Sequence, residues 1–144
     1  MFDSINAWLE DFPDHVLPAQ KLDVNAFDPS CFPSQLAIAE SNVDVILCIN
    51  MVHISPWQST INLFRLASQS LRKGGFVMTY GPYRVKGSMT ESNVAFDASL
   101  KARNPEWGVR DLEAVEEIAK QYGLVLKEFV EMPSNNLSVI FDKL

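Results

Sequence analysis

Histidine and tyrosine side chains follow two apolar runs of this sequence, and both residue types can accept, hold or donate a proton. His53 comes three residues after the run VDVILCIN at 43–50, which makes it a candidate general base. The alternative is a solvent-facing or loop-bracing histidine. Tyr83 follows the run GFVMTY at 75–80 and is a candidate to gate a pocket or stack on a substrate, although an aromatic residue there can simply pack. His15 falls in a predicted loop and receives no role.

Side chains rich in hydrogen-bond donors gather near the end of a long polar segment. Arg103, Trp107 and Arg110 are candidates to hold an anionic or carbonyl-bearing substrate, because the arginine fork matches carboxylate and phosphate groups. The alternative is structural. In that interpretation Arg110 pairs with Asp97 or Asp111, and Trp107 packs beneath a lid.

Four more polar residues have both a local and a functional interpretation. Asn50 offers donor and acceptor groups at the end of a predicted strand, or else bonds to its own backbone. Asp23 lies in a short predicted strand around residues 20–24 and could be a turn or cap residue as well as a hydrogen-bond acceptor. Asn135 and Asn136 tolerate the left-handed geometry of a turn, which is reason enough for their presence there.

Other chemistries have little support in the sequence. We find no spacing typical of a metal site and no Ser/His/Asp arrangement. The two cysteines, Cys31 and Cys48, form no disulfide framework. Cys48 lies inside an apolar run, so we predict a buried core thiol.

Strands and helices alternate in the elements that must position these residues. The predicted segments are a helix over 4–12, strands over 20–24, 43–50 and 75–80, helices over 57–71, 92–103 and 111–123, and strands over 124–131 and 137–143. The run 43–50 is nearly all apolar, which is typical of a parallel strand buried on both faces. Residues 25–42, with Pro29 and Pro33, are predicted to be irregular.

Capping and turn residues set the predicted boundaries. Ser55 and Pro56 are the expected N-cap and first-turn proline of the helix that follows, and Gly74 is its expected stop. Glu116 and Lys120 lie four residues apart on one helix, which favours an ion pair. The turn MPSNN at 132–136 predicts an antiparallel hairpin between the last two strands.

This layout is a doubly wound α/β fold, in which ligands bind outside the carboxyl ends of the strands. That rule brings four places to one edge: Asp23, the stretch 50–53, the stretch 80–83 and the turn 134–136. The segment 81–110 starts at the same edge, and long insertions of this kind often serve as lids.

Composition restricts the partners. The chain has 144 residues, of which 47% are hydrophobic and 21% charged, enough for one domain core. The net charge of −6 and the lack of a basic face argue against nucleic acid. No apolar run approaches the ~20 residues of a membrane span. We therefore expect a small-molecule ligand and a cytoplasmic location.

Four motifs in order carry a family resemblance: CINMVHISPW at 48–57, YGPY at 80–83, SNVAFDASLKARNPEWGVRD at 92–111 and EMPSNN at 131–136. Together they resemble the methyltransferase-like 26 family of class I S-adenosylmethionine-dependent methyltransferase-like proteins. The resemblance implies a Rossmann-like sheet of seven strands in the order 3-2-1-4-5-7-6. This chain would supply strands three to seven, ending in the antiparallel hairpin.

The resemblance also implies roles. S-adenosylmethionine is the implied cofactor, with Asp23 at its adenine and Asn50 and Met51 beside it, and a small acceptor is the implied substrate. His53 and Tyr83 become the candidate catalytic residues. The candidate substrate-binding residues are Tyr80, Asn93, Asp97, Arg103, Trp107, Arg110, Asn135 and Asn136.

The chain departs from that family at its start. None of its six glycines forms a G-x-G loop, so we interpret residues 1–144 as one methyltransferase-like domain that lacks the amino-terminal glycine-rich cofactor unit. Without strands one and two the strand 43–50 would have a bare edge, which favours a homo-oligomer. The alternatives to an enzyme are a shortened, non-catalytic isoform that acts as an interaction module and, less well supported, a nucleotide-binding regulatory domain.

Overall fold

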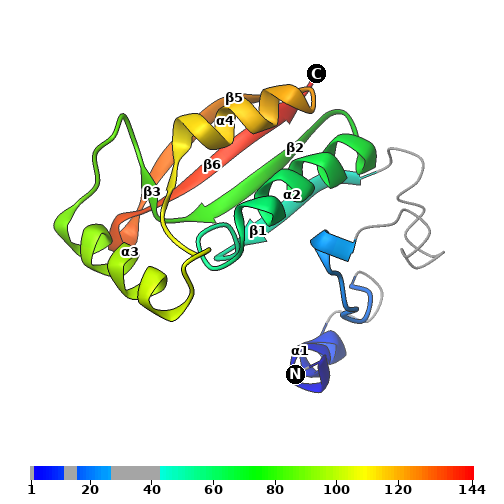
Figure 1. Cartoon of the computed structure of the whole chain (residues 1–144). Coiled ribbons are helices and arrows are strands. Elements are labelled where there is room, and N and C mark those ends of the chain that lie inside the picture. Colours follow the sequence, from blue (N-terminus) through cyan, green and yellow to red (C-terminus); the bar gives the residue numbers. More distant parts are fainter. Residues whose placement is uncertain (1, 12–15, 27–42) are drawn as a thin grey trace.

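A four-stranded mixed sheet forms the centre of the computed structural model, which describes residues 2–11, 16–26 and 43–144 (Figure 1). Its strands are, in spatial order, β1 (Val43–Ile49), β2 (Leu71–Gly81), β6 (Asn136–Lys143) and β5 (Leu124–Met132). β1 and β2 are parallel, and β6 is antiparallel to both of its neighbours, β2 and β5. The α/β fold class and the terminal antiparallel hairpin are confirmed.

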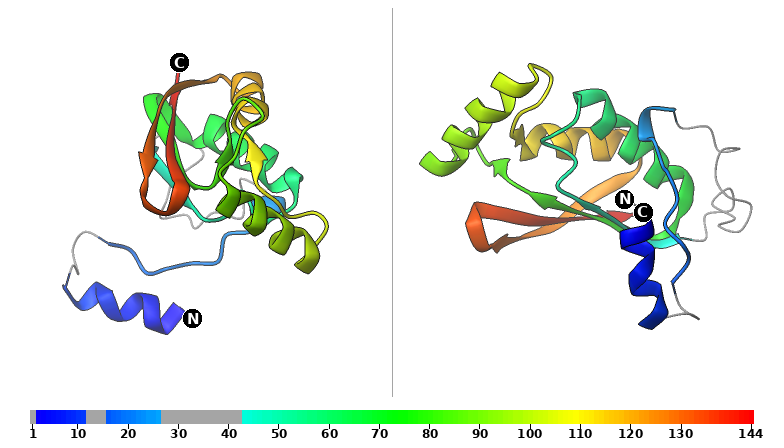
Figure 2. Two further views of the ribbon diagram at one scale, coloured as in Figure 1. Left: turned by 90° about the vertical axis from the view of Figure 1, so that its left-hand side faces the viewer. Right: turned by 90° about the horizontal axis from the view of Figure 1, so that it is seen from below.

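Two helices, α2 (Trp57–Ser70) and α4 (Leu112–Gln121), pack on the same face of this sheet (Figure 2). Their apolar residues recur at the predicted helical spacing and meet the inward residues of the strands in one core. Its fully buried members include Phe64 and Ala67 of α2, Val115 and Ala119 of α4, and Val77, Val139 and Phe141 of the strands. The ring of Phe64 meets that of Phe141 edge-on, with 5.0 Å between centroids.

The opposite face of β1 is open. Val45 is 38% exposed, and Leu47 and Ile49 are each 59% exposed. The prediction of a strand buried on both faces was therefore wrong for this run. A continuous apolar run predicts two covered faces, but within the described residues only α2 lies over β1, on the side of Ile46 and Cys48. The thiol of Cys48 is buried, as predicted, and burial raises its pKa to about 11.

The long polar segment after β2 contains its own small unit. Strands β3 (Tyr83–Arg84) and β4 (Arg110–Asp111) pair in parallel, and helix α3 (Glu91–Arg103) lies between them in the sequence. The helix predicted over 92–103 is confirmed. Thr90 caps it, because its hydroxyl accepts a hydrogen bond from the backbone N–H of Asn93 at 3.4 Å.

The carboxyl-terminal prediction agrees closely with the structure. α4 is followed by the hairpin β5–β6, and Glu116 pairs with Lys120 at 2.8 Å. The hairpin turn is a short 3-10 segment, Pro133–Asn135. Ser134 and Asn135 have φ values of 62° and 58° there, so the left-handed geometry expected of this turn is present at both residues.

Agreement is weakest at the amino terminus. The helix expected over 4–12 is a short α1 (Phe2–Asn6) followed by a 3-10 helix, Ala7–Asp11. Residues 20–23 form no strand, and Val24–Ala26 is a 3-10 helix. A strand needs a neighbour to pair with, and the described residues offer none at this place. Most of the segment 25–42, with Cys31, Pro29 and Pro33, and also His15, lies outside the described residues.

Predicted boundaries moved at both ends of α2. Pro56 rather than Ser55 is the N-cap residue, and the Ser55 hydroxyl instead donates to the Met51 carbonyl at 2.9 Å. β2 begins at Leu71, directly after the helix, so Gly74 lies within the strand with a φ of 73°. In the described part of the chain, no helix is long and apolar enough to cross a membrane.

Candidate functional site

The carboxyl ends of β1 and β2 lie side by side and start the site. The backbone N–H of Asn50 donates to the Tyr80 carbonyl at 2.9 Å. Asn50 has a φ of 55°, a conformation that asparagine tolerates better than most residues, and there the chain leaves the sheet. Residues 50–53, which we call the β1 loop, follow directly.

His53 lies at the end of the β1 loop and is 5% exposed. Its carbonyl accepts a hydrogen bond from Gly108 N–H at 3.0 Å, and its ring meets Phe96 edge-on at 5.7 Å. Gly81 makes room for the imidazole, since a Cβ there would lie 2.9 Å from Nδ1 of His53. Burial lowers the pKa of His53, and the charge of Arg110 lowers it further. The ring is therefore neutral at pH 7 and is able to accept a proton.

A cavity of about 300 Å³ opens beside this imidazole, and we call it the His53 cavity. Its walls come from the β1 loop, the end of β2, helix α3 and the hairpin turn. The lining residues are Asn50, His53, Pro82, Ser92, Asn93, Phe96, Ser134 and Asn136. The structure thus brings four separately predicted site residues, Asn50, His53, Asn93 and Asn136, around one space.

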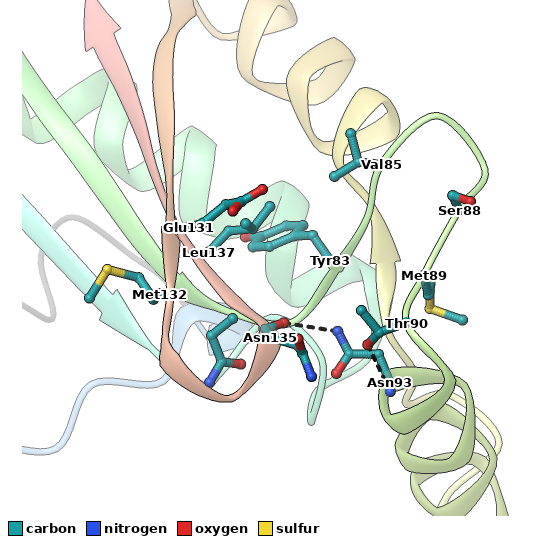
Figure 3. Close-up of a pocket in the computed structure, with 11 residues that line it drawn as sticks. Tyr83, Val85, Ser88, Met89, Thr90, Asn93, Glu131, Met132, Asn135 and Leu137 are labelled. Carbon is teal, nitrogen blue, oxygen red and sulfur yellow. Dashed lines mark hydrogen bonds between the residues drawn. The ribbon is translucent and has the colours of Figure 1, made fainter.

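A second cavity, of about 540 Å³, lies between α3 and the hairpin, and we call it the hairpin cavity (Figure 3). Asn93 and Asn136 line both cavities. The apolar wall of the hairpin cavity consists of Tyr83, Val85, Met89, Met132 and Leu137, and its polar lining of Ser88, Thr90, Asn93, Glu131, Asn135 and Asn136.

A third cavity, of about 430 Å³, is lined by Asp23 and by Met51 of the β1 loop. We call it the Asp23 cavity. Asp23 accepts a hydrogen bond from the backbone N–H of Asn25 at 2.9 Å, so its local capping role is present. Asn25 in turn donates to the Ser59 hydroxyl of α2 at 3.0 Å, which holds the segment against the helix. Trp107 lines the same cavity.

Asparagine side chains connect α3 to the hairpin. The Asn93 amide donates to the Asn135 carbonyl at 2.9 Å, and the Asn135 amide donates to the Ser92 hydroxyl at 2.8 Å. The Asn136 amide donates to the Tyr80 hydroxyl at 3.1 Å. These contacts close the cavities at the hairpin end and fix the orientation of the amides.

Tyr83 is almost fully buried, and its hydroxyl lies 2.7 Å from Oγ1 of Thr79. Burial raises its pKa well above the usual range. The phenol therefore stays protonated near neutral pH. In this state Tyr83 shapes the wall of the hairpin cavity and is not available as a base.

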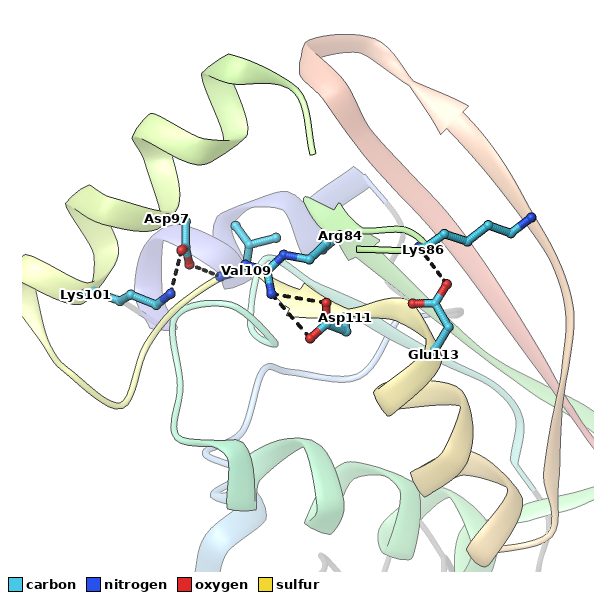
Figure 4. A network of polar contacts seen from close by, with 7 residues as sticks. All are labelled: Arg84, Lys86, Asp97, Lys101, Val109, Asp111 and Glu113. Carbon is cyan, nitrogen blue, oxygen red and sulfur yellow. Dashed lines mark hydrogen bonds and ion pairs between the residues drawn. The ribbon is translucent and has the colours of Figure 1, made fainter. Parts of the chain in front are cut away.

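Carboxylates tie α3 and its flanking loops together (Figure 4). Asp97 accepts from the buried N–H of Val109 at 2.8 Å and pairs with Lys101 at 2.6 Å. Burial acts to raise the pKa of Asp97, but these two hydrogen bonds and the charges of Lys101 and Arg84 together outweigh it, so the pKa is lowered. Asp111 pairs with Arg84 at 3.1 Å. Asp97 thus holds α3 against the segment before β4. It does not line any of the three cavities.

Arg110 has different partners from those expected. It pairs with neither Asp97 nor Asp111, and it donates instead to the carbonyls of Val52, Ser55 and Glu106 at 3.3, 2.7 and 2.7 Å. The guanidinium also lies 5.6 Å from the ring centroid of Trp57. Arg110 therefore braces the β1 loop against the segment after α3.

Arg103 lies apart from the other candidates. It is exposed on α3 and donates to the Ser99 carbonyl at 3.3 Å. Neither Arg103 nor Arg110 lines any of the three cavities. Within the described ranges, no group of three or more His, Cys, Asp or Glu residues is placed to hold a metal ion.

Sequence reasoning missed several lining residues, among them Phe96, Met89 and Glu131. Glu131 directly precedes the predicted turn and Met132 is its first residue, and this position was the available signal. Phe96 had none, because the buried face of α3 carries Asn93, Asp97 and Leu100, with little apolar periodicity.

Solved structures of methyltransferases share this fold at low sequence identity. LaPhzM superposes with a TM-score of 0.73 at 12% identity, over 99% of this chain and 40% of that one. An O-methyltransferase family protein from Burkholderia thailandensis gives 0.72 at 12% identity, over 98% of this chain and 40% of that one. Human N-acetylserotonin methyltransferase, solved in complex with SAM, superposes with a TM-score of 0.68 at 12% identity, over 86% of this chain and 33% of that one.

These likenesses establish a Rossmann-like, methyltransferase-like fold. This chain spans only 33% to 40% of the length of the three proteins, so it has the fold of one part of them. A family model described as "Protein of unknown function (DUF938)" matches residues 1–143. The chain therefore belongs to the DUF938 family.

Proposed function

We propose that this chain forms the later part of a class I S-adenosylmethionine-dependent methyltransferase domain of the methyltransferase-like 26 family. The complete protein would transfer a methyl group to a small acceptor. The observation that carries the proposal is the strand order β1-β2-β6-β5, in which β6 alone runs against the other strands of this sheet. It corresponds to strands four, five, seven and six of the class I order.

The position of the β1 loop supports a division of roles. Met51 lines the Asp23 cavity, whereas Asn50 and His53 line the His53 cavity. A donor bound on one side of the loop would therefore meet an acceptor bound on the other. Methyl transfer depends mainly on holding the two reactants in line, and a loop that contributes residues to both cavities suits that task.

The residues of the Asp23 cavity fit the adenosine end of the cofactor. Leu22, Met51, Ile54 and Trp107 provide apolar surface for a flat base, and Asp23 provides an acceptor for an amino group. S-adenosylmethionine, when bound, supplies an electrophilic methyl group. The described residues include no glycine-rich loop for its methionine end, so we assign only the adenine side to this chain.

His53 is the proposed proton acceptor. Its ring is neutral because burial lowers its pKa, and it lines the cavity assigned to the acceptor. A neutral imidazole within hydrogen-bond reach of an acceptor hydroxyl or amine would take up the proton released on methylation. Tyr80, Asn93, Asn135 and Asn136 would shape the acceptor side, with Tyr83 behind them. We place the reaction in the cytoplasm, where a free thiol such as Cys48 stays reduced.

Titration calorimetry of the chain with S-adenosylmethionine tests this proposal. We expect binding in the micromolar range, and Asp23→Asn should weaken it roughly two- to tenfold, the worth of one hydrogen bond. Asp44→Asn is the matched control, because Asp44 lies at the far end of β1 and its pair with Arg72 is exposed. No binding of the unaltered chain at millimolar cofactor would defeat the cofactor assignment.

A second candidate function is that of an interaction module, without catalysis. The exposed face of β1 favours it, since Leu47 and Ile49 are each 59% exposed, and among the described strands one edge of β1 has no partner. An unpaired strand edge is a template for another strand. A second copy of the chain is the proposed occupant, and its test is given in the Discussion.

A further inference from the structure

The polar lining of the hairpin cavity consists of hydroxyl, amide and carboxylate groups, with no basic side chain among the described residues. Of the described residues around it, Glu131 alone carries a charge, and no lysine, arginine or histidine takes part. A carboxylate or phosphate ligand would therefore enter without a counter-charge and beside a negative group. Desolvation of such an anion is unfavourable unless it is paired, so the cavity discriminates against anions.

Most amide donors at this cavity are already used by the protein itself. Asn93 donates to the Asn135 carbonyl, and Asn136 donates to the Pro133 carbonyl at 3.4 Å as well as to Tyr80. Because a carbonyl can only accept, these two bonds fix which end of each amide is the NH₂ group. The amide oxygens are left as acceptors.

Asn93 makes this polarity most evident. The residue is 7% exposed and lines both the hairpin cavity and the His53 cavity. Its NH₂ group is bonded to Asn135, and among the described residues its Oδ1 atom has no hydrogen-bond partner. A ligand with an N–H group would satisfy that oxygen.

Glu131 provides the charge. It lies near the end of β5, paired in register with Leu137, and Figure 3 shows it beside Leu137 and Tyr83 at the cavity wall. Within the described ranges its carboxylate has no ion pair and no hydrogen bond. An exposed carboxylate over an apolar wall is a common arrangement for holding an ammonium group.

We propose that the hairpin cavity binds a small molecule carrying a basic amine on an apolar ring or chain. The ammonium group would lie beside Glu131, the apolar part would pack on Tyr83, Val85 and Leu137, and an N–H group of the ligand would donate to Oδ1 of the Asn93 side chain. Only one part of this assignment rests on the proposed function, namely that the bound amine is the methyl acceptor. The binding itself needs no cofactor and can be measured on the chain alone.

Three indole probes that differ in charge test the proposal by calorimetry at pH 7: tryptamine, indole-3-ethanol and indole-3-propionate. We expect the affinity to fall in that order. Glu131→Gln should weaken tryptamine about two- to fivefold, the range of an exposed ion pair, and leave indole-3-ethanol unchanged. Glu131→Lys should reverse the preference, so that the propionate binds more tightly than the amine.

Glu128→Gln is the matched control. Glu128 lies on the same strand, pairs in register with Ile140 and does not line the cavity, so its loss should leave all three affinities unchanged. The proposal is overturned if tryptamine does not bind, if the propionate binds as tightly, or if Glu128→Gln acts like Glu131→Gln. S-adenosylmethionine titration is a separate measurement, so failure of the cofactor assignment is distinguishable from failure of this one.

Discussion

His53 combines burial, a neutral ring and a cavity, and these three properties depend on its neighbours. The absence of a side chain at Gly81 leaves space for the ring, and Gly108 holds the backbone. Arg110 braces the same loop through the Val52 and Ser55 carbonyls. The sequence could indicate His53 as a candidate from its position after a strand, but the role of Arg110 depends on carbonyl groups, which leave no pattern in the residue types.

The lowered pKa of His53 predicts a pH dependence of stability. The unfolded chain binds a proton near the ordinary pKa of about 6.5, where the folded chain does not. The contribution of His53 to the free energy of unfolding is therefore fully present above about pH 6.5, the ordinary pKa. It is lost as the pH falls through the pKa of His53 in the folded chain. Denaturant titrations from pH 8 to pH 5 should show a falling free energy of unfolding in the unaltered chain. His53 should account for at most about 1.4 kcal/mol per pH unit of this fall.

His53→Gln should remove that part of the decline. His15→Gln is the control, since it deletes the other histidine of the sequence. A decline that persists in His53→Gln and vanishes in His15→Gln would show that the titrating group has been misassigned.

At the scale of elements, α3 is held mainly by polar contacts. Its buried residues are Asn93, Asp97 and Leu100, and two of these three are polar. Asp97 is the tether to the segment that leads into β4, through the Val109 N–H. A helix attached in this way can keep its place over the cavities without a large apolar face of its own.

Removal of this tether should destabilise the fold. Asp97→Ala leaves the buried Val109 N–H without a partner, at an expected loss of about 1–3 kcal/mol in unfolding free energy. Asp97→Asn keeps an acceptor oxygen for the Val109 N–H and should reduce the unfolding free energy by less. It loses only the ion pair with Lys101, whose side chain is half-exposed. Urea denaturation followed by circular dichroism measures both. Equal losses in the two variants would contradict the tether.

The elements that depend on local interactions were predicted better than those that depend on pairing with distant parts of the chain. α4 and the hairpin follow from apolar periodicity, from a helix-stopping glycine and from turn residues, which are local signals. The expected strand over 20–24 failed because pairing is not a local property. The same limit applies to β1, whose composition predicts two covered faces while its neighbours provide one. In the site, the residues at strand ends and in the hairpin turn had a positional signal, whereas Phe96 had none, because the buried face of α3 shows little apolar periodicity.

At the scale of the whole molecule, α2 and α4 lie on one face of the sheet, and the apolar core lies between these two helices and the strands (Figure 2). Among the described strands, β2 and β6 are paired on both sides, whereas β1 and β5 each have one paired edge. β1 exposes Val45, Leu47 and Ile49, and β5 exposes Phe129, Val130 and Met132. Among these apolar residues of the two edge strands, the largest exposed fractions are those of Leu47 and Ile49 on β1.

Self-association through β1 is the expected consequence. Sedimentation velocity over a concentration series should show a dimer in the unaltered chain, and Leu47→Lys should shift it to monomer because an edge lysine opposes strand pairing. Val94→Lys, at an equally solvent-exposed apolar position on α3 (52%), is the control and should leave the dimer intact. A chain that is monomeric at all concentrations would count against this interface.

The β1 loop forms a wall of the His53 cavity through Asn50 and His53, and a wall of the Asp23 cavity through Met51. Occupants of the two cavities thus act on the same four residues. If one occupant alters the preferred arrangement of the loop, it changes the affinity for the other by some factor. Thermodynamic linkage then requires the reverse effect to have the same size. In that case a short stretch of chain after one strand would make two separate binding events interdependent.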